Sequence, residues 1–434
     1  MKAIEVGLIG LGTVGTGVAK ILLEKEKKFE ELIGVPIKLK KIAELDLKRD
    51  RGISIPSGLL TDRSDEVIND PDISIIIELI GGLEPARTLI LKALEKGKHV
   101  VTANKALLAH NGGELFQKAE ELKLDIGFEA SVCGGIPVIL TFQQGLVANE
   151  IESLLGIFNG TCNYILTRMT EDGLPYAEAL KEAQQKGYAE ADPTLDVEGM
   201  DTVHKLSILM HLAYGAPLAP EEIFVKGITR VSALDISFAR EFGYTIKLLA
   251  ICRKVGQGLE ARVHPTMIPK DHILANVRGV NNALYLKGDA VGDILLYGQG
   301  AGMMPTGSAV VSDLVNLSRN IYKGITRRIS GPLSTRAFEG QGLACKPLAE
   351  VMTHYYFRFF ALDRPGVLST IAGILGANQI SVASVIQKGR EIEGSVPIVM
   401  MTHEAREAAV QKAIAEIDRL PVITDQTVII RVEG

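Results

Sequence analysis

Asp201 and Lys205 are four residues apart at the start of a long apolar run. On a helix this spacing puts both side chains on one face, where a surface ion pair is the commoner outcome. The run from Leu206 to Leu212 indicates instead a largely buried helix. A lysine that is held beside a carboxylate and partly desolvated is a candidate general acid or base, so Lys205 is a candidate catalytic residue.

Lys105 and Glu190 are further candidates, and each has a second interpretation. Lys105 follows an expected parallel strand in the segment VTANKALL, and ligands collect at the carboxyl ends of such strands. It can equally be a solvated lysine at the start of a helix. Glu190 offers the carboxylate that a substrate ammonium group requires, but it can also cap a helix or face water.

The segment GLGTVG begins at residue 10, directly after an expected strand and before an expected helix. This G-x-G-x-x-G spacing permits a tight turn, a close approach of a pyrophosphate and close packing of the helix on the strand. The free N–H groups at the helix start favour phosphate binding. A glycine turn without a ligand is the alternative. The predicted cofactor contacts are Gly10, Leu11, Gly12, Thr13, Val14 and Gly15.

The residues after the second expected strand leave the choice between NAD and NADP open. Glu44 or Asp46 would accept hydrogen bonds from the ribose of NAD. Lys48, Arg49 and Arg51 form a basic loop that would pair with the 2′-phosphate of NADP, although such a loop is as often a solvated turn. We therefore predict a nicotinamide dinucleotide, NADP or NAD, as the cofactor.

The composition argues against several classes of protein. A formal net charge of −5 over 434 residues gives no broad basic surface for nucleic acid or an anionic membrane. The four cysteines lie far apart, which suggests neither a disulfide framework nor a thiolate zinc site. The N-terminal segment runs directly into the glycine turn and does not resemble a secretion signal, and no apolar run is suited to span a bilayer. We expect a cytoplasmic protein with small-molecule partners.

The hydrophobic pattern predicts an α/β protein with a Rossmann-type parallel sheet, because short apolar runs alternate with amphipathic helices over the first 130 residues. Residues 1–130 are expected to form a dinucleotide-binding domain that a helix at 305–323 completes, to about residue 325. Residues 131–304 are expected to be an α+β catalytic and dimerisation domain. The expected strands are 4–9, 37–43, 73–80, 99–102, 125–129 and 151–159, and the expected helices of the second domain are 175–185 and 201–214.

The end of the chain is expected to form a separate module. Residues 326–350 have several glycines and little periodicity, so they are expected to be a linker. Residues 351–434 show the order βαββαβ, which is typical of a ferredoxin-like fold. The expected elements are strands at 355–362, 380–387, 396–402 and 427–432 and helices at 367–377 and 404–420.

Together these segments resemble the homoserine dehydrogenase family with a C-terminal ACT domain. The resemblance runs in order to about residue 320, and its most specific part is the segment AQQKGYAEADPTLDVEGMDTVHK from Ala183 to Lys205. Other matching segments are Glu78–Gly82, Val101–Leu108, Gly134–Pro137, Gly160–Tyr164, Val263–Pro265 and Gly298–Gly302. One departure is Leu45, which precedes Asp46 where many NADP-preferring relatives have arginine, and this puts a strict NADP preference in doubt.

The resemblance implies reversible NAD(P)-dependent reduction of L-aspartate 4-semialdehyde to L-homoserine, a step of threonine, methionine and isoleucine biosynthesis. It implies that Lys205 donates the proton to the aldehyde oxygen and that Lys105 lies close to the nicotinamide. Gly187 and Gly302 would also contact the cofactor. The implied substrate-binding residues are Glu190, Asp201, Gly160, Thr161, Tyr188 and Asp196.

The resemblance further implies a monovalent cation, Na⁺ or K⁺, with a structural role. It would sit on main-chain carbonyl groups of the turn, with Glu129, Val132, Gly134 and Ile136 as ligands. The ACT domain would bind an amino-acid effector, which the family suggests is L-threonine, or would only hold subunits together. The implied effector-binding turn contains Asp363, Gly366, Val367 and Leu368.

The resemblance also suggests a homo-oligomer, either a dimer or a tetramer. Two other functions stay open at this point. One is a different amino-acid or hydroxy-acid dehydrogenase with an ACT domain, against which the segment from Ala183 to Lys205 argues. The other is a non-catalytic amino-acid sensor, against which the presence of both Lys105 and Lys205 argues.

Overall fold

The computed structural model describes residues 3–56, 58–216, 220–328, 343–387 and 395–434. The chain divides into two compact units, which are described separately. Unit 1 contains residues 1–158, 201–223 and 281–343, and unit 2 contains residues 159–200, 224–280 and 344–434. Most of the linker expected at 326–350, including all its glycines, lies outside the described residues. The domain boundaries drawn from the sequence stay a prediction.

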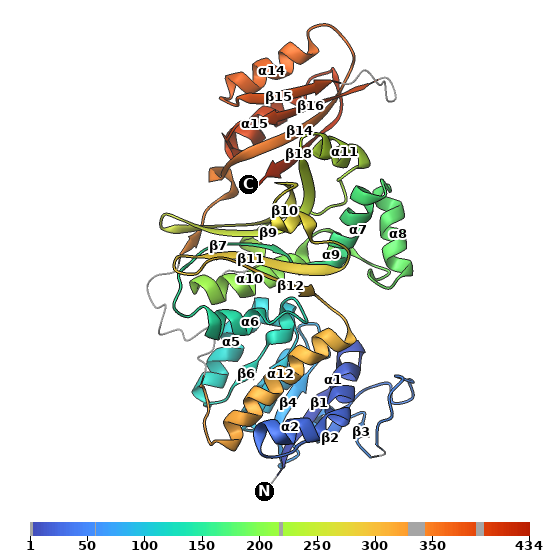
Figure 1. The fold of residues 1–434 in the computed structure, drawn as a ribbon, viewed down its shortest axis with the longest axis vertical. Coiled ribbons are helices and arrows are strands. Elements are labelled where there is room, and N and C mark those ends of the chain that lie inside the picture. The colour runs from blue at the N-terminus through green and yellow to red at the C-terminus, as the bar shows by residue number, and fades with distance from the viewer. Residues whose placement is uncertain (1–2, 57, 217–219, 329–342, 388–394) are drawn as a thin grey trace. The chain divides into compact units, whose positions relative to one another are not determined.

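The first part of unit 1 is a parallel six-stranded sheet with the order β3-β2-β1-β4-β5-β6 (Figure 1). The strands are β1 (Ile4–Ile9), β2 (Ile37–Ala43), β3 (Leu60–Thr61), β4 (Ile73–Glu78), β5 (His99–Thr102) and β6 (Ile126–Gly127). This arrangement confirms the Rossmann-type prediction. The strand expected at 125–129 is shorter than predicted, because Glu129–Ser131 already form a 3₁₀ turn.

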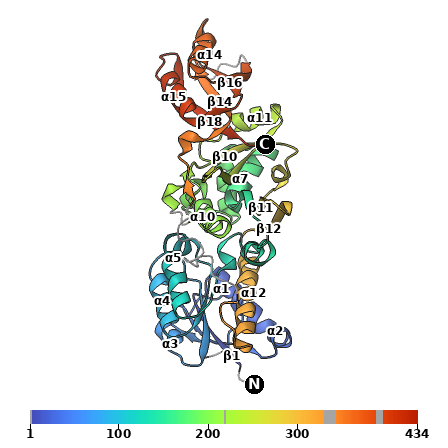
Figure 2. The same ribbon diagram turned by 90° about the vertical axis from the view of Figure 1, so that its left-hand side faces the viewer.

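Helices cover both faces of this sheet, with α1, α2 and α12 on one face and α3, α4 and α5 on the other (Figure 2). They are α1 (Thr13–Glu24), α2 (Glu26–Ile33), α3 (Ser64–Ile68), α4 (Ala86–Glu95), α5 (Lys105–Glu121) and α12 (Met303–Tyr322). The helix expected at 305–323 is therefore present as α12, and it packs directly on α1. A Cβ atom on Gly17 would lie 2.1 Å from the Met303 carbonyl oxygen, so this close approach requires glycine.

The rest of unit 1 contains an antiparallel set of strands in the order β12-β11-β7. These are β7 (Ile151–Ile157), β11 (Asn281–Gly288) and β12 (Gly292–Gln299). Further helical elements are α6 (Val138–Leu140), the π-helical turn Thr141–Gly145, α10 (Met200–Tyr214) and the 3₁₀ helix Pro220–Glu222. Helix α10 is buried along almost its whole length, as the apolar run after Lys205 predicted.

Unit 2 combines a long hairpin with four helices and the C-terminal module. The hairpin strands, β9 (Tyr244–Val255) and β10 (Gly258–Pro269), are antiparallel, and the end of β10 pairs in parallel with β18. The other elements before the module are α7 (Gly160–Glu171), α8 (Tyr176–Gln185), α9 (Thr194–Val197), β8 (Phe224–Val225) and α11 (Ala233–Glu241). The sequence analysis gave no bounds for this hairpin.

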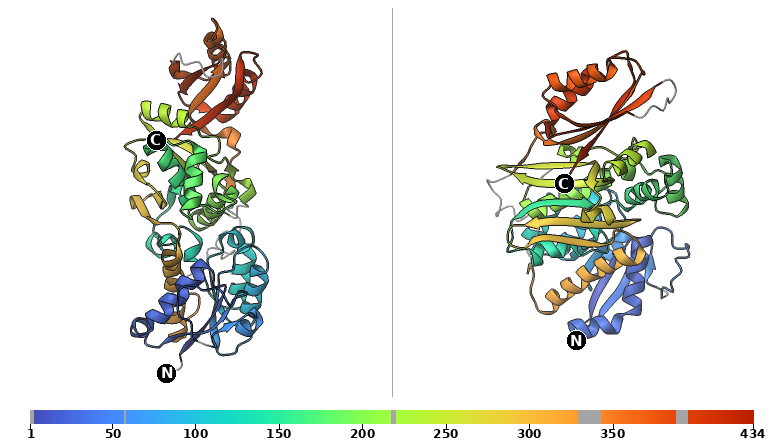
Figure 3. Two further views of the ribbon diagram at one scale, coloured as in Figure 1. Left: turned by 90° about the vertical axis from the view of Figure 1, so that its right-hand side faces the viewer. Right: turned by 45° about the horizontal axis from the view of Figure 1, so that its top comes forward.

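The C-terminal module has the predicted βαββαβ order, with the sheet order β18-β14-β16-β15. Its elements are β14 (Met352–Ala361), α14 (Val367–Ala377), β15 (Val382–Gln387), β16 (Val396–Thr402), β17 (Ala405–Arg406), α15 (Glu407–Ile417) and β18 (Ile423–Val432). Both helices lie on one face of the sheet (Figure 3), where Phe357 and Phe359 form a core with apolar residues of α14 and α15. In the described part of the chain, no helix is long and apolar enough to cross a membrane.

Candidate functional site

Three of the predicted site residues meet in unit 1. The Asp201 carboxylate lies between two lysines: its Oδ2 is 2.7 Å from Nζ of Lys205, and its Oδ1 is 3.0 Å from Nζ of Lys105. Lys205 also donates to the Phe158 carbonyl oxygen, at 2.6 Å. The helical spacing of Asp201 and Lys205 therefore produces the predicted pair, and the fold adds Lys105 to it.

The burial of this cluster shows that the pair is not a surface ion pair. Asp201 and Lys205 are 7% and 9% exposed, whereas the Lys105 side chain is 40% exposed. The cluster thus has one buried ammonium group and one that reaches solvent. The Cys133 thiol is fully buried, and burial raises its pKa to about 12, so it is not available as a thiolate at neutral pH.

The position of Lys105 follows from the start of helix α5. Asn104 caps this helix, since its side-chain oxygen accepts a hydrogen bond from the Leu107 N–H at 3.1 Å. The Asn104 side-chain amide also donates to the Gly82 carbonyl oxygen at 2.6 Å. Lys105 is therefore the first residue after the cap, at the carboxyl end of β5, where the sequence pattern placed it.

The glycine turn after β1 has the geometry that a pyrophosphate needs. Gly10 has a φ of +97°, and a Cβ atom on Gly15 would lie 2.1 Å from the Gly10 carbonyl oxygen. By contrast, no atom lies within 4 Å of a Cβ atom built on Gly12. The turn therefore requires its first and third glycines for packing, while the second leaves open space beside the start of α1.

A cavity next to this turn contains the residues that bear on the choice of cofactor. Oε2 of Glu44 accepts a hydrogen bond from the Leu11 N–H at 2.7 Å, so this carboxylate holds the glycine turn. The Arg51 side chain is only 6% exposed and donates to the carbonyl oxygens of Leu11, Arg49 and Asp46. Asp46 accepts hydrogen bonds from two backbone N–H groups of its own loop. The Arg49 side chain is exposed and lines the cavity.

Most of the predicted substrate-binding residues belong to unit 2, around the start of helix α7. Asn159 caps this helix by accepting from the Cys162 N–H at 2.8 Å, and it donates to Oδ1 of Asp196 at 2.7 Å. The Thr161 hydroxyl donates to the Tyr188 carbonyl oxygen at 2.5 Å. Two residues of the predicted substrate set, Asp196 and Tyr188, are thus tied directly to the first turn of α7.

The remaining predicted residues of this region lie at the surface of unit 2. Glu190 is exposed, and so are Gly187 and Tyr188, whose ring lies 5.0 Å from the Tyr164 ring. Gly187 has a φ of +73° at the end of α8. In unit 1, Gly302 has a φ of +125° and precedes α12.

The turn predicted to bind a cation is buried in unit 1. Both carboxylate oxygens of Glu129 accept backbone hydrogen bonds, from Ile139 and Leu140 at 2.8 Å each, and burial raises the pKa of this group to about 7. Gly134 has a φ of +43°, and a Cβ atom there would lie 2.5 Å from the Gly300 carbonyl oxygen. Among the described residues, no group of three acidic, histidine or cysteine side chains is arranged to hold a metal ion.

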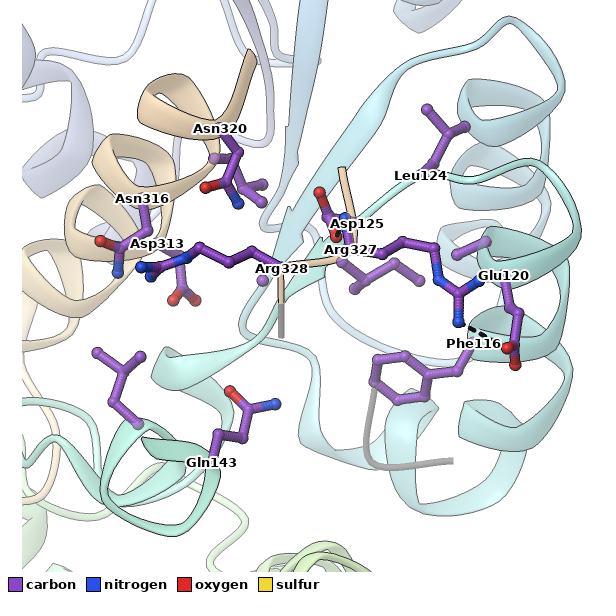
Figure 4. Close-up of a pocket in the computed structure, with 15 residues that line it drawn as sticks. Phe116, Glu120, Leu124, Asp125, Gln143, Asp313, Asn316, Asn320, Arg327 and Arg328 are labelled. Atoms are coloured by element: carbon purple, nitrogen blue, oxygen red, sulfur yellow. Dashed lines mark hydrogen bonds and ion pairs between the residues drawn. The ribbon is translucent and has the colours of Figure 1, made fainter. Parts of the chain in front are cut away.

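Asp313 on α12 supports this turn from the other side by accepting the Glu129 N–H at 2.7 Å. It also lines a cavity, shown in Figure 4, together with Asn316, Asn320 and Asp125, and the side chain of Arg328 extends into it. None of the described residues that line this cavity is a predicted site residue.

The predicted effector-binding turn joins β14 to α14 in unit 2. Gly366 has a φ of +93° and caps α14, and both Gly366 and Asp363 are exposed. Leu368 is also exposed, at 38%, whereas Val367 packs into the module core. The turn therefore presents a polar and an apolar side chain to solvent.

Several residues that shape these sites were missed by the sequence analysis. Phe158 acts through its carbonyl oxygen, and Asn159, Asn104 and Asp313 act through hydrogen bonds to backbone N–H groups. The two Asn caps precede helix starts, which is a signal that the sequence carries. The roles of Phe158 and Asp313 have no local sequence signal.

Comparison with protein families assigns all three parts of the chain. A family model for homoserine dehydrogenase matches residues 137–315, a model for the homoserine dehydrogenase NAD-binding domain matches residues 10–129, and an ACT domain model matches residues 355–422.

Individual proteins agree with these matches, two of them over the whole length of this chain. A homoserine dehydrogenase of Neisseria gonorrhoeae is 42% identical, with 100% of this chain and 99% of the relative covered. A crystal structure of a homoserine dehydrogenase from Thiobacillus denitrificans is 43% identical with a TM-score of 0.92, covering 100% of this chain and 99% of that one. A hyperthermophilic archaeal homoserine dehydrogenase in complex with NADPH is 26% identical with a TM-score of 0.62, covering 73% of this chain and 98% of that one.

Proposed function

The chain belongs to the homoserine dehydrogenase family and is an oxidoreductase, and we propose that it interconverts L-aspartate 4-semialdehyde and L-homoserine with NAD(P). The observation that carries the proposal is the cluster of Lys105, Asp201 and Lys205, in which one carboxylate holds two ammonium groups. The test is turnover of L-homoserine by the purified protein with NAD or NADP. We further propose that this reaction serves threonine, methionine and isoleucine biosynthesis.

In this proposal Lys205 delivers and removes the proton on the reacting oxygen. When bound, the nicotinamide supplies or accepts the hydride at the adjacent carbon. The ammonium group of Lys205 neutralises the negative charge that develops on the oxygen during reduction, and this stabilises the transition state. The Phe158 carbonyl oxygen and Asp201 accept hydrogen bonds from this ammonium group and so fix its direction. Asp201 likewise pairs with Lys105, which reaches solvent and in this proposal contacts the substrate and the nicotinamide.

For the substrate, we propose that Glu190 binds the amino group, together with Asp196 and the polar groups of Tyr188. The first turn of α7 would bind the substrate carboxylate, because Gly160 and Thr161 present free backbone N–H groups at a helix start. The hydrogen bonds from Asn159 to Asp196 and from Thr161 to the Tyr188 carbonyl support this proposal, since they fix these residues relative to one helix end.

For the cofactor, we propose that the glycine turn from Gly10 to Gly15 binds the pyrophosphate and that Gly187 and Gly302 contact the rest of the dinucleotide. The open space at Gly12 fits the approach of a phosphate. Glu44 and Arg51 are occupied with backbone groups, whereas the Arg49 side chain is exposed at the cavity. We therefore propose that both NAD and NADP bind and that Arg49 contacts the 2′-phosphate of NADP.

Replacing Arg49 with alanine tests this assignment. The variant is expected to lose about tenfold in kcat/KM with NADP, since a charge-assisted hydrogen bond to phosphate is lost, and to keep its kcat/KM with NAD. The measurement is steady-state kinetics with each cofactor at saturating L-homoserine. Lys48→Ala, in the same exposed loop, is the matched control. An equal loss with both cofactors in Arg49→Ala would show that this side chain supports the loop and does not distinguish the cofactors.

We also propose a monovalent cation, Na⁺ or K⁺, on the turn from Glu129 to Ile136, with Val132 and Gly134 as further ligands. The main-chain carbonyl groups of this turn would hold the ion, and the burial of the four residues supports the proposal because it limits competition from water. Its role would be to hold the turn, and comparing activity in sodium, potassium and large organic cations tests the proposal.

For the ACT domain, we propose that L-threonine binds at the turn of Asp363, Gly366, Val367 and Leu368 and inhibits the enzyme. Asp363→Ala is expected to raise the threonine concentration for half-inhibition about tenfold, because a carboxylate that accepts from the effector's ammonium group is removed. Activity without threonine should stay at the parent value. Glu416→Ala, exposed on α15, is the control. Unchanged threonine inhibition in Asp363→Ala would place the effector elsewhere.

Point variants suit this test better than truncation. Deleting the module would remove β18, which pairs with β10, and Glu433, to which the buried Arg262 donates.

We propose that the protein is a homo-oligomer, a dimer or a tetramer. The exposed Tyr297 and Val291 on or beside the outer strand β12 of unit 1 support this proposal, since apolar side chains on an edge strand favour association.

A further inference from the structure

Lys247 is a buried lysine in unit 2 that none of the proposed roles uses. It lies in the middle of β9 and is 3% exposed. Within the described part of the chain, no carboxylate forms an ion pair with it. Burial lowers its pKa to about 8, because removal from water disfavours the charged form. Burying a charged lysine costs folding free energy unless hydrogen bonds compensate for the lost water. The partners of these hydrogen bonds therefore indicate what the lysine does.

The hydrogen bonds of Lys247 connect helix α7 with the segment at residues 277–280. Nζ of Lys247 donates to the side-chain oxygen of Asn163 at 3.1 Å and to the Val277 carbonyl oxygen. Asn163 is also buried and belongs to α7, three residues after Gly160. Since its oxygen accepts from Lys247, its amide nitrogen must face the other way. That nitrogen donates to the carbonyl oxygens of Val277 and Gly279, at 3.2 and 3.0 Å.

Residues 277–280 are thereby fastened along the first turns of α7. Gly279, with a φ of +61°, donates its N–H to the Thr167 hydroxyl at 3.2 Å, and this hydroxyl donates to the Asn163 carbonyl oxygen. The segment comes so close that a Cβ atom on Gly160 would lie 2.7 Å from the Val280 carbonyl oxygen. The segment therefore limits where the first turn of α7 can lie.

We infer that Lys247 is a positioning residue for substrate binding: through Asn163 it holds residues 277–280 against α7 and so fixes the helix start that carries Gly160 and Thr161. This inference rests on the proposed function, in which these two residues bind the substrate carboxylate. Lys247 does not touch the substrate. It acts on the affinity for substrate and not on the proton transfer, which belongs to Lys205.

Lys247→Met tests the inference, since methionine has a similar length but cannot donate. KM for L-homoserine is expected to rise roughly ten- to hundredfold, because the variant loses the hydrogen bonds of a charged donor. In contrast, kcat and the cofactor dissociation constant should change less than about threefold. Lys247→Gln keeps two N–H donors and should recover much of the affinity. Lys254→Met, exposed on the same strand, is the control and should match the parent.

A double-mutant cycle with Asn163→Leu tests the connection itself. If Lys247 acts through Asn163, the double variant should have a KM close to that of either single variant, whereas independent effects would multiply. Far-ultraviolet circular dichroism and thermal unfolding identify variants that fail to fold, and in that case Asn163→Asp carries the test. This variant cannot donate to the Val277 and Gly279 carbonyl oxygens, so its KM should rise while kcat stays near the parent value. Normal KM in folded Lys247→Met, in a parent that turns over L-homoserine, would overturn the inference. A parent without turnover would instead contradict the proposed function.

Discussion

Lys205→Ala is expected to lower kcat for L-homoserine oxidation by about 10²- to 10⁴-fold, the usual contribution of a positioned general acid or base. The variant loses the buried ammonium group that the Phe158 carbonyl oxygen and Asp201 orient. Binding of NAD(P)H, measured by its fluorescence, should stay near the parent value, because Lys205 lies on α10 and not on the glycine turn.

Two further variants separate proton transfer from the packing of the cluster. Lys181→Ala, exposed on α8, is the control for loss of a lysine and should keep full activity. Asp201→Asn keeps the shape of the side chain but leaves Lys105 and Lys205 close together without the negative charge between them. It should lower kcat and also destabilise the protein. A Lys205→Ala variant with parental kcat would remove Lys205 from the mechanism.

Asp235→Asn is expected to produce the largest loss of stability, about 3–5 kcal/mol, because it leaves a buried arginine without its partner. Asp235 is 0% exposed, and Nε and Nη2 of Arg358 donate to its two oxygens at 2.7 and 3.0 Å. The same carboxylate accepts from the Tyr356 hydroxyl and forms the capping box of α11 with Ser232. This one residue therefore joins α11 to the sheet of the ACT domain.

Chemical denaturation with circular dichroism measures this loss. Arg278→Gln is the matched control, because it breaks the exposed pair of Arg278 with Glu171 and should cost at most about 1 kcal/mol. The double variant Asp235→Asn/Arg358→Met should recover part of the stability, since no charge is then left buried alone. A loss below about 1 kcal/mol in Asp235→Asn would show that water or a rearranged side chain replaces the carboxylate.

The elements that the sequence predicted well are those with a strong local pattern. The strands at 37–43 and 396–402 and the helix at 367–377 have the predicted bounds, and α10 begins one residue early. In each of these elements, runs of apolar residues or turn signals such as the glycine before Val367 predict where the strand or helix begins and ends. The pairing of Asp201 with Lys205 is also local, since helical spacing alone brings them together.

What the sequence left open depends on contacts between distant segments. Lys105 reaches Asp201, and the Glu129 N–H reaches Asp313, only through the fold, and the second contact accompanies the early end of the strand expected at 125–129. That Glu44 or Asp46 accepts from the ribose of NAD stays a prediction, and the contact of the Glu44 carboxylate with the Leu11 N–H is one that no spacing rule predicts. The role of Lys247 could not be predicted for the same reason, because no sequence pattern indicates which residue a lysine in an apolar strand will contact.

The measurement that tests the central proposal most directly is oxidation of L-homoserine by the purified parent protein, followed at the absorbance of the reduced nicotinamide. Parallel reactions contain NAD or NADP, and Lys205→Ala at equal concentration excludes a contaminating dehydrogenase. We predict turnover with at least one cofactor that depends on both L-homoserine and Lys205. Folded protein that binds NAD(P)H but does not oxidise L-homoserine, or that oxidises another amino or hydroxy acid instead, would contradict the proposal.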